Sequence, residues 1–209
     1  MRTKILFFLA ALSLTAGAAT VEELFLAENT GVYNLLNRQA RLIIVDNYKS
    51  GATVPVTNNM QGDSSRVVSL TDDEIVVMTS PSRKVQTRLL TSGRDSVLAV
   101  VETVYTPYPD SRITFYTTAW KQLPAEKRIS PYPTSELLIK RDASDAALAT
   151  LAITALPMLE MTLEGNRLVV KHCYKQQLGA EEWRQVESSL YPAVYYEIKG
   201  IKLKQIKTR

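Results

Sequence analysis

Strand-favouring residues recur in short runs between residues 53 and 120, and turn-favouring residues separate these runs. Val, Ile, Thr and aromatic residues are typical of strands, whereas Gly, Pro, Asn and Asp are typical of turns. Such short connections join antiparallel neighbours, because parallel strands need a crossover of about a dozen residues or more. The pattern predicts an antiparallel meander with the strands Thr53–Thr57, Arg66–Leu70, Glu74–Thr79, Lys84–Leu90, Ser96–Thr106 and Ser111–Trp120.

The longest of these runs, Ser96–Thr106, is apolar on both of its faces. A strand with one face in water would alternate between apolar and polar residues. We therefore expect a central strand that helices or the second half of the chain cover on both faces. It should pair with Ser111–Trp120 across the loop Pro107–Asp110, and this pairing should bury Val101 and Phe115.

Two helices are predicted before the meander. Thr20 offers a capping hydroxyl ahead of Glu22 and Glu23, and acidic residues in a first turn stabilise a helix. Arg38–Lys49 is ambiguous, because its β-branched residues favour a strand. Gly51 stands where a glycine commonly ends a helix, and we therefore favour the helix.

The second half of the chain mixes helix and hairpin signals. Three prolines between Lys121 and Pro133 predict a linker, residues 121–135. The fold class is therefore α+β, with an antiparallel meander sheet packed with helices and a smaller C-terminal hairpin-helix-hairpin unit. The domains are then residues 20–120 and 136–209, or one continuous domain. The elements expected after the linker are helices at Asp142–Ala155 and Gly179–Leu190 and hairpins at Leu159–Leu163 with Arg167–Tyr174 and Val194–Ile198 with Ile201–Ile206.

The first 19 residues have the pattern of a cleavable secretory signal. Arg2 and Lys4 precede a ten-residue apolar run, and small residues follow it. Ten residues form about 15 Å of helix, which is short of the ~30 Å hydrocarbon core, so a membrane anchor is disfavoured. Cleavage is expected after Ala18 or one residue later, and no cysteine near this point offers a lipidation site. We expect a periplasmic or secreted protein whose mature chain has no transmembrane segment.

The mature chain has nearly balanced charge and a single cysteine. Removal of Arg2 and Lys4 leaves 23 of the 25 basic residues against 21 acidic ones, so the net charge falls from +4 to +2. This charge does not call for a nucleic-acid partner. Cys173 alone cannot form an intramolecular disulfide, so stability must come from packing.

The sequence lacks the residues of most common catalytic sites. His172 is the only histidine, which excludes HExxH zinc hydrolases and other sites with two imidazoles. No G-x-S-x-G elbow, Walker A loop or G-x-G-x-x-G sequence occurs. His172 and Cys173 are neighbours on a predicted strand, so their side chains should point to opposite faces and not form a nucleophile pair. We predict no catalytic residue, no cofactor and no metal site.

Two features remain open to a functional interpretation. Asp72, Asp73 and Glu74 form the densest acidic cluster, but a hydroxyl with two Asp is also what a tight turn selects, and we favour the turn. Tyr108 and Tyr132 lie in proline-rich segments that are expected to be loops. Exposed loop aromatics often make contacts with partners, so these two residues are the candidate recognition aromatics.

Five segments stand in a distinctive order and spacing: RLIIVDNYKSG (41–51), VTNNMQGDS (56–64), LTDDEIVV (70–77), SRITFYTTAWKQL (111–123) and YYEIKGIKL (195–203). In this order they resemble a family of secreted proteins of unknown function from gut-dwelling Gram-negative anaerobes. This family has no assigned activity, catalytic residue or ligand, so the resemblance implies a compartment and a whole-chain fold only. The family commonly has a Trp near the final turn where this chain has Ile198, so no role of that aromatic carries over.

The sequence favours a non-catalytic binding or assembly module of the periplasm or cell surface. Its partner is an unknown envelope protein, glycan or lipid. One alternative is a carboxylate-based hydrolase, whose paired acids come from distant parts of a chain and leave no local motif. The other is a carrier of an apolar ligand, which needs an aliphatic cavity between the sheet and the helices.

Overall fold

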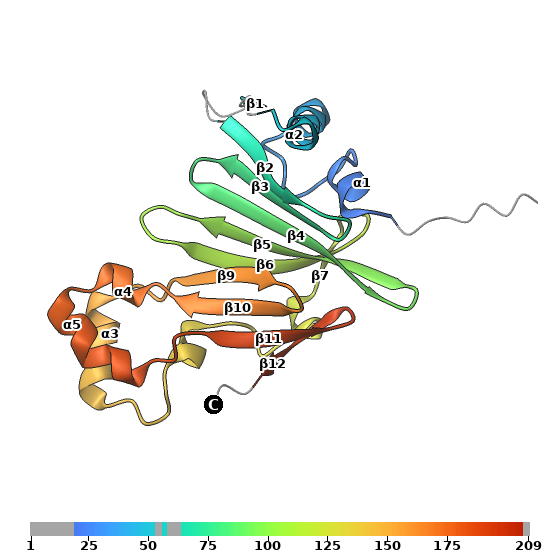
Figure 1. Ribbon diagram of the computed structural model, residues 1–209. Coiled ribbons are helices and arrows are strands. Elements are labelled where there is room, and N and C mark those ends of the chain that lie inside the picture. The colour runs from blue at the N-terminus through green and yellow to red at the C-terminus, as the bar shows by residue number, and fades with distance from the viewer. Residues whose placement is uncertain (1–18, 53–55, 58–63, 207–209) are drawn as a thin grey trace, which may run out of the picture.

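The strands form two sheets in the computed structural model, which describes residues 19–52, 56–57 and 64–206 (Figure 1). The first is an antiparallel meander of seven strands in the order β1 to β7. The six predicted runs correspond to β1 to β6, although residues 53–55 of the first run lie outside the described residues, and β7 was not predicted. The α+β fold class is thereby confirmed. The strands of this sheet are β1 (Val56–Thr57), β2 (Ser64–Leu70), β3 (Glu74–Ser80), β4 (Arg83–Ser92), β5 (Asp95–Val104), β6 (Asp110–Thr117) and β7 (Gln122–Leu123).

The second sheet is mixed and has five strands in the order β8-β12-β11-β10-β9. Its two hairpins are those that the glycine-containing turns predicted, and β8 joins the edge of β12 in parallel. The strand bounds are β8 (Ile129–Ser130), β9 (Leu159–Glu164), β10 (Arg167–His172), β11 (Val194–Lys199) and β12 (Lys202–Ile206).

The N-terminal helices begin and end at the residues that the sequence suggests. In α1 (Val21–Phe25) the Thr20 hydroxyl accepts a hydrogen bond from the Glu23 amide, and the Glu23 carboxylate accepts one from the Thr20 amide. The ambiguous segment is a helix, α2 (Arg38–Ser50), which Asn37 caps. Gly51 ends α2 at a φ of 70°, a conformation that glycine adopts without steric cost.

Strand β5 is covered on both faces, as its apolar pattern predicted. Leu98 and Val100 pack with α1, α2 and the segment between them. Val97, Ala99 and Val101 pack on the other side with residues of the second sheet. The molecule therefore has helices on one face of the first sheet and the second sheet on its other face (Figure 1). The predicted pairing of β5 with β6 is confirmed, and both Val101 and Phe115 are fully buried.

The free edge of β9 is covered by side chains of the first sheet. The amide of Leu163 donates to Gln86 Oε1 at 2.9 Å, and Gln86 Nε2 donates to the Leu163 carbonyl at 2.7 Å. The amide of Met161 donates to Ser111 Oγ at 3.0 Å. Buried backbone groups need such partners, so these polar side chains hold the second sheet at a defined place on the first.

A third group of apolar residues joins the helices of the second half. These are α3 (Asp145–Thr154), α4 (Tyr174–Gln177) and α5 (Ala180–Val186). Ser144 caps α3, so the helix begins three residues after Asp142, where it was predicted to begin. Their shared core consists of Ala147, Leu151, Tyr174, Val186 and Leu190.

Several predicted elements differ from the observed ones. The helix expected at Gly179–Leu190 is α up to Val186 and continues as a 3₁₀ turn at Glu187–Ser189. The strand expected to reach Tyr174 ends at His172, and α4 begins at Tyr174. The segment expected to be a linker contributes β7 to the first sheet and β8 to the second. The division into domains stays a prediction, and the predicted signal lies outside the described residues except for Ala19.

Candidate functional site

The connection between α1 and α2, residues 26–37, is held against the first sheet by aromatic side chains. Tyr33 is fully buried, and its hydroxyl lies 2.7 Å from the Thr87 hydroxyl of β4. Trp120 packs edge-on against Tyr33 and donates from Nε1 to the Leu24 carbonyl at 2.9 Å. Its φ of 59° is uncommon for a bulky residue, so these contacts keep the indole in a strained but fixed position.

Arg41 of α2 fixes the same connection from the helix side. Its side chain is 3% exposed, and Nη2 donates to the Ala27 carbonyl at 2.7 Å. Nη1 donates to the Thr30 hydroxyl and to the Leu36 carbonyl. Burial lowers the pKa of the guanidinium below its ordinary value, and the Glu28 carboxylate opposes this shift. Arg41 therefore joins three points of the connection, which preorganises it.

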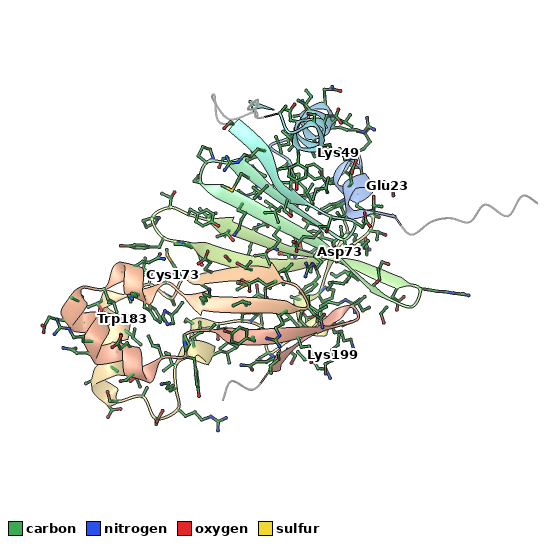
Figure 2. The ribbon with its side chains drawn as sticks, viewed as in Figure 1. Glu23, Lys49, Asp73, Cys173, Trp183 and Lys199 are labelled. Atoms are coloured by element: carbon green, nitrogen blue, oxygen red, sulfur yellow. The ribbon has the colours of Figure 1, made fainter. Side chains whose placement is uncertain are left out.

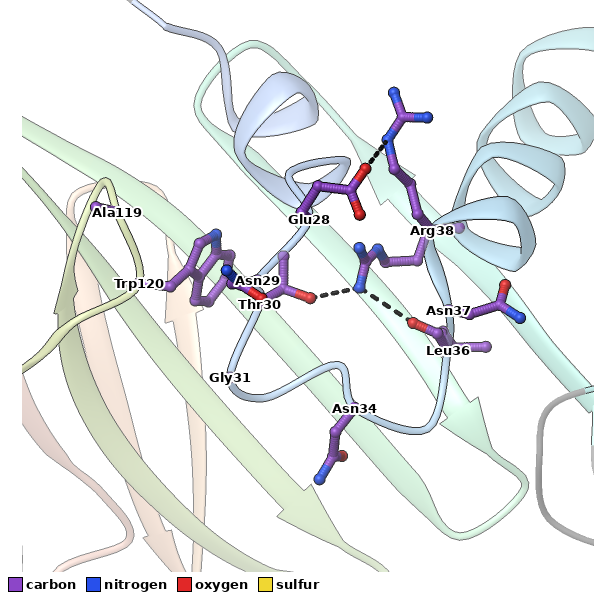
Figure 3. A pocket seen from close by; sticks show the side chains of 11 residues that line it. Glu28, Asn29, Thr30, Gly31, Asn34, Leu36, Asn37, Arg38, Ala119 and Trp120 are labelled. Carbon is purple, nitrogen blue, oxygen red and sulfur yellow. Dashed lines mark hydrogen bonds and ion pairs between the residues drawn. The ribbon is translucent and has the colours of Figure 1, made fainter.

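The fixed connection borders an open pocket of about 520 Å³, which we call the asparagine pocket (Figure 3). Its volume falls within the range of small-molecule sites, about 300–1,000 Å³. Most of its lining comes from one stretch of the chain, and the turn between β6 and β7 supplies the opposite wall. The lining residues are Glu28, Asn29, Thr30, Gly31, Asn34, Leu36, Asn37, Arg38, Arg41, Ala119 and Trp120.

The lining of the asparagine pocket is suited to hydrogen bonding. Within the described part of the chain, the exposed carboxamides of Asn29 and Asn34 make no hydrogen bond. Asn37 uses its oxygen to cap α2, which leaves its amide nitrogen free to donate. Among the described residues of the lining, Glu28 is the single carboxylate, and its Oε1 lies 3.5 Å from Arg38 Nε. The pocket thus offers several neutral donors and acceptors around one ion pair.

Two smaller pockets contain acidic side chains that already have partners. One of about 320 Å³ includes Glu102, which is buried and pairs with Arg83 and with Arg112, the latter at 2.9 Å. The same pocket includes Asp110, whose Oδ1 accepts from the Leu159 amide at 3.4 Å. The other pocket, of about 350 Å³, lies near Asp73 and the turns of the second sheet.

The acidic cluster after β2 has the geometry of a turn. The Thr71 hydroxyl donates to Asp73 Oδ1 at 2.8 Å and accepts from the Glu74 amide at 3.0 Å. Arg88 Nη2 lies 3.0 Å from Glu74 Oε2. Burial is the main cause of a raised Glu74 pKa, while Arg88 acts in the opposite direction. These contacts bear out the interpretation of residues 72–74 as a tight turn.

The two candidate recognition aromatics lie outside the asparagine pocket. Tyr132 is 41% exposed, and its hydroxyl donates to the Ile113 carbonyl of β6 at 3.2 Å. Tyr108 is half-buried in the loop between β5 and β6. Tyr132 therefore has a structural contact, and the recognition role of both residues stays a prediction.

His172 and Cys173 were predicted to be neighbours on a strand. This prediction is wrong, because β10 ends at His172. The His172 ring stacks on Tyr174 with centroids 5.1 Å apart, and burial lowers the pKa of its imidazole. The Cys173 thiol is buried and donates to the Pro109 carbonyl at 3.1 Å (Figure 2). Burial, with smaller effects of Glu160 and Asp110, raises the pKa of this thiol to about 11.

The raised pKa predicts that Cys173 reacts slowly in the folded protein. At pH 8, about one thiol in a thousand would be thiolate, which is the nucleophilic form. We expect a disulfide exchange reagent to label the native protein at least about 100-fold more slowly than the protein in guanidinium chloride. The absorbance of the released thiol measures both rates. A native rate within about tenfold of the unfolded rate would contradict the buried position of this thiol.

The residues of the asparagine pocket were not predicted as site residues. The available signal was the occurrence of Asn29, Asn34 and Asn37 within nine residues. Among the described residues, no group of three or more His, Cys, Asp or Glu side chains could hold a metal ion. No helix in that part of the structure is long and apolar enough to cross a membrane.

Comparisons with known proteins identify a family and a fold. The structure of a domain of an uncharacterized protein from Porphyromonas gingivalis W83 is similar, with a TM-score of 0.72 and 24% sequence identity. The match covers 90% of this chain and 100% of that one, and it shows a shared fold. No protein with a curated description is similar enough to match. A family model described as a protein of unknown function, DUF3256, matches residues 13–202, and this chain therefore belongs to that family.

Proposed function

We propose that this protein is a non-catalytic binding module of the periplasm or cell surface and that the asparagine pocket is its binding site. The observation that carries the proposal is the pair of exposed carboxamides, Asn29 and Asn34, on the connection that Tyr33, Arg41 and Trp120 fix. A preorganised wall with uncommitted donors and acceptors lowers the entropic cost of binding a polar ligand.

The chemistry of the lining favours a glycan over the other proposed partners. A carboxamide both donates and accepts hydrogen bonds, and so does each hydroxyl of a sugar. An apolar ligand would need an aliphatic lining, whereas Leu36, Ala119 and Trp120 are the apolar residues of this pocket. Export through the predicted signal would bring such a module into contact with envelope glycans.

The same lining supports binding more than hydrolysis. A glycosidase needs two carboxyl groups on opposite sides of the scissile bond, and the described residues of this pocket supply one, Glu28. In the smaller pocket with two acids, Glu102 pairs with two arginines and Asp110 accepts from a backbone amide. Both carboxylates therefore have partners already, and neither is placed as the unpaired general base of a hydrolase.

The proposal predicts a loss of glycan binding when the carboxamides are removed. The double variant Asn29→Ala/Asn34→Ala should weaken binding about tenfold or more, because each lost hydrogen bond contributes roughly 1 kcal/mol. The measurement is a glycan array of bacterial-envelope oligosaccharides with the purified mature chain, followed by calorimetric titration of the best binder. Both substituted residues are exposed, so thermal unfolding should remain unchanged.

A matched control removes two carboxamides elsewhere. Asn166→Ala/Gln176→Ala changes exposed residues outside the asparagine pocket and should retain the affinity of the unmodified protein. If the unmodified protein, the double variant and the control bound the glycan with equal affinity, the asparagine pocket would not be the binding site. An array on which no oligosaccharide binds would refute the glycan as ligand class, and release of a cleaved product would favour the hydrolase alternative.

A further inference from the structure

Two charged side chains are buried in the described part of the chain, and they differ in their partners. Glu102 is 6% exposed and forms ion pairs with Arg83 and Arg112. Arg41 is buried more deeply, and among the described residues it has no ion-pair partner. A buried charge ordinarily has a partner of opposite sign, because its removal from water is costly. The positive charge of Arg41 therefore lacks the counterion that such a position calls for.

The hydrogen bonds of Arg41 do not supply that counterion. Its guanidinium donates to two backbone carbonyls and to the Thr30 hydroxyl, which are neutral acceptors. Its Nε is buried and has no hydrogen-bond partner among the described residues. Burial is the main cause of the lowered pKa of this group, and Arg38 lowers the pKa further while Glu28 raises it. Because Arg41 lines the asparagine pocket, this charge belongs to the wall of that pocket.

The second arginine of the pocket has hydrogen-bond donors to spare. Arg38 Nε donates to the Leu26 carbonyl at 3.1 Å, which orients the guanidinium. Its Nη1 and Nη2 make no hydrogen bond within the described residues. The ion pair with Glu28 is loose, because Arg38 Nε and Glu28 Oε1 lie 3.5 Å apart and the side chains are 50% and 80% exposed (Figure 3). A ligand oxygen can therefore reach Arg38 in competition with Glu28.

The two arginines and the one carboxylate leave the described lining of the asparagine pocket with a net charge of +1. Arg38 and Arg41 are three residues apart on α2, a spacing that places their side chains on the same side of the helix. A wall that is rich in neutral hydrogen-bonding groups and also carries an excess positive charge is suited to a sugar that bears an anionic group.

We propose that the glycan bound in the asparagine pocket is acidic and that the carboxylate of a uronic acid lies against Arg38, within the field of Arg41. This inference rests on the proposed function and names its ligand class more closely. The fork of N–H donors on a guanidinium matches the two oxygens of a carboxylate. A carboxylate carries one negative charge, which equals the excess of the lining, whereas a phosphate monoester carries nearly two. Asn29 and Asn34 remain available to the sugar hydroxyls.

The test compares galacturonate and glucuronate oligosaccharides with their methyl esters, which keep the hydroxyls and lack the charge. Calorimetric titration of the mature chain at about 20 mM salt should show that an acid binds at least about tenfold more tightly than its ester. About 500 mM salt should remove most of this difference, because a partly exposed charge is screened by ions.

Two substitutions should change the affinity for the acid in opposite directions. Arg38→Gln should weaken binding of the acid about tenfold or more and leave binding of the ester unchanged. Glu28→Gln should strengthen binding of the acid, because it removes the carboxylate that competes for Arg38. A purely structural role of the ion pair would not produce this gain. Arg41 itself is left in place, since its loss would release the connection that it fixes.

The matched control is an exposed arginine outside the asparagine pocket. Arg184 of α5 lies 3.5 Å from Glu181, as Arg38 does from Glu28, and Arg184→Gln should leave both affinities unchanged. Thermal unfolding establishes that each variant remains folded.

The inference and the proposed function can fail separately. If acids and esters bound equally well, or if Glu28→Gln did not strengthen binding of the acid, the inference would be wrong. The proposed function would still hold in that case, provided that a neutral glycan from the array lost its affinity in Asn29→Ala/Asn34→Ala. A sulfated oligosaccharide that bound more tightly than every uronic acid would overturn the assignment to a carboxylate.

Discussion

Phe115→Ala is expected to lower the free energy of unfolding by about 3–5 kcal/mol, as truncation of a buried aromatic residue does in other cores. Phe115 is fully buried on β6 and faces the second sheet. Its removal leaves a cavity between two sheets whose backbones are fixed by their own ladders, so the surroundings cannot close around it. Urea unfolding followed by circular dichroism measures the change through the transition midpoint.

A matched control for Phe115 is an exposed aromatic residue. Tyr48 of α2 is 40% exposed, and Tyr48→Ala should change the free energy of unfolding by less than about 1 kcal/mol. A loss below about 1 kcal/mol in Phe115→Ala itself would be incompatible with the register in which Phe115 faces Ala99 on β5.

Gln86→Leu is expected to lower the free energy of unfolding by about 2–4 kcal/mol, because it leaves two buried backbone groups unpaired. Gln86 is 4% exposed and bonds both the amide and the carbonyl of Leu163 on β9. It also donates to the Glu74 carboxylate at 3.0 Å. Leucine has a similar volume, so the loss would reflect missing hydrogen bonds more than a cavity. Chemical unfolding with intrinsic fluorescence measures it.

An exposed strand glutamine gives the control for this effect. Gln122 of β7 is exposed, and Gln122→Leu should alter the free energy of unfolding by no more than about 0.5 kcal/mol. If Gln86→Leu cost as little as Gln122→Leu, the carboxamide would not be a required link between the sheets.

The sequence predicted those parts of the fold that a pattern within one short segment of the chain reveals. Ser96–Thr106 shows on both faces that it is a central strand, and Gly51 marks the end of α2. The parallel pairing of Ile129 with Leu203 has no such signal, because a two-residue strand is too short to show a period. Proline-rich composition suggested a linker there, although residues 129–130 complete the edge of a sheet.

The candidate site was harder to predict than the fold. The asparagine pocket forms only when the turn at Ala119 and Trp120 approaches residues 28–41, and the two segments lie far apart in the sequence. Tyr108 and Tyr132 were selected because prolines surround them, which indicates a loop but not what lies beside it. The hydroxyl of Tyr132 binds the backbone of β6, a contact that no local pattern encodes.

The covered edge of β9 also limits how this chain can join others. An exposed strand edge is a template for strand addition, the step by which folded β-proteins aggregate or acquire a strand from a partner. At this edge the amides of Leu159, Met161 and Leu163 are already bound to side chains of the first sheet. The outer strands β1, β7 and β8 are each two residues long within the described chain. Strand addition at the edge of β9 therefore has little template, because its backbone donors are already bound.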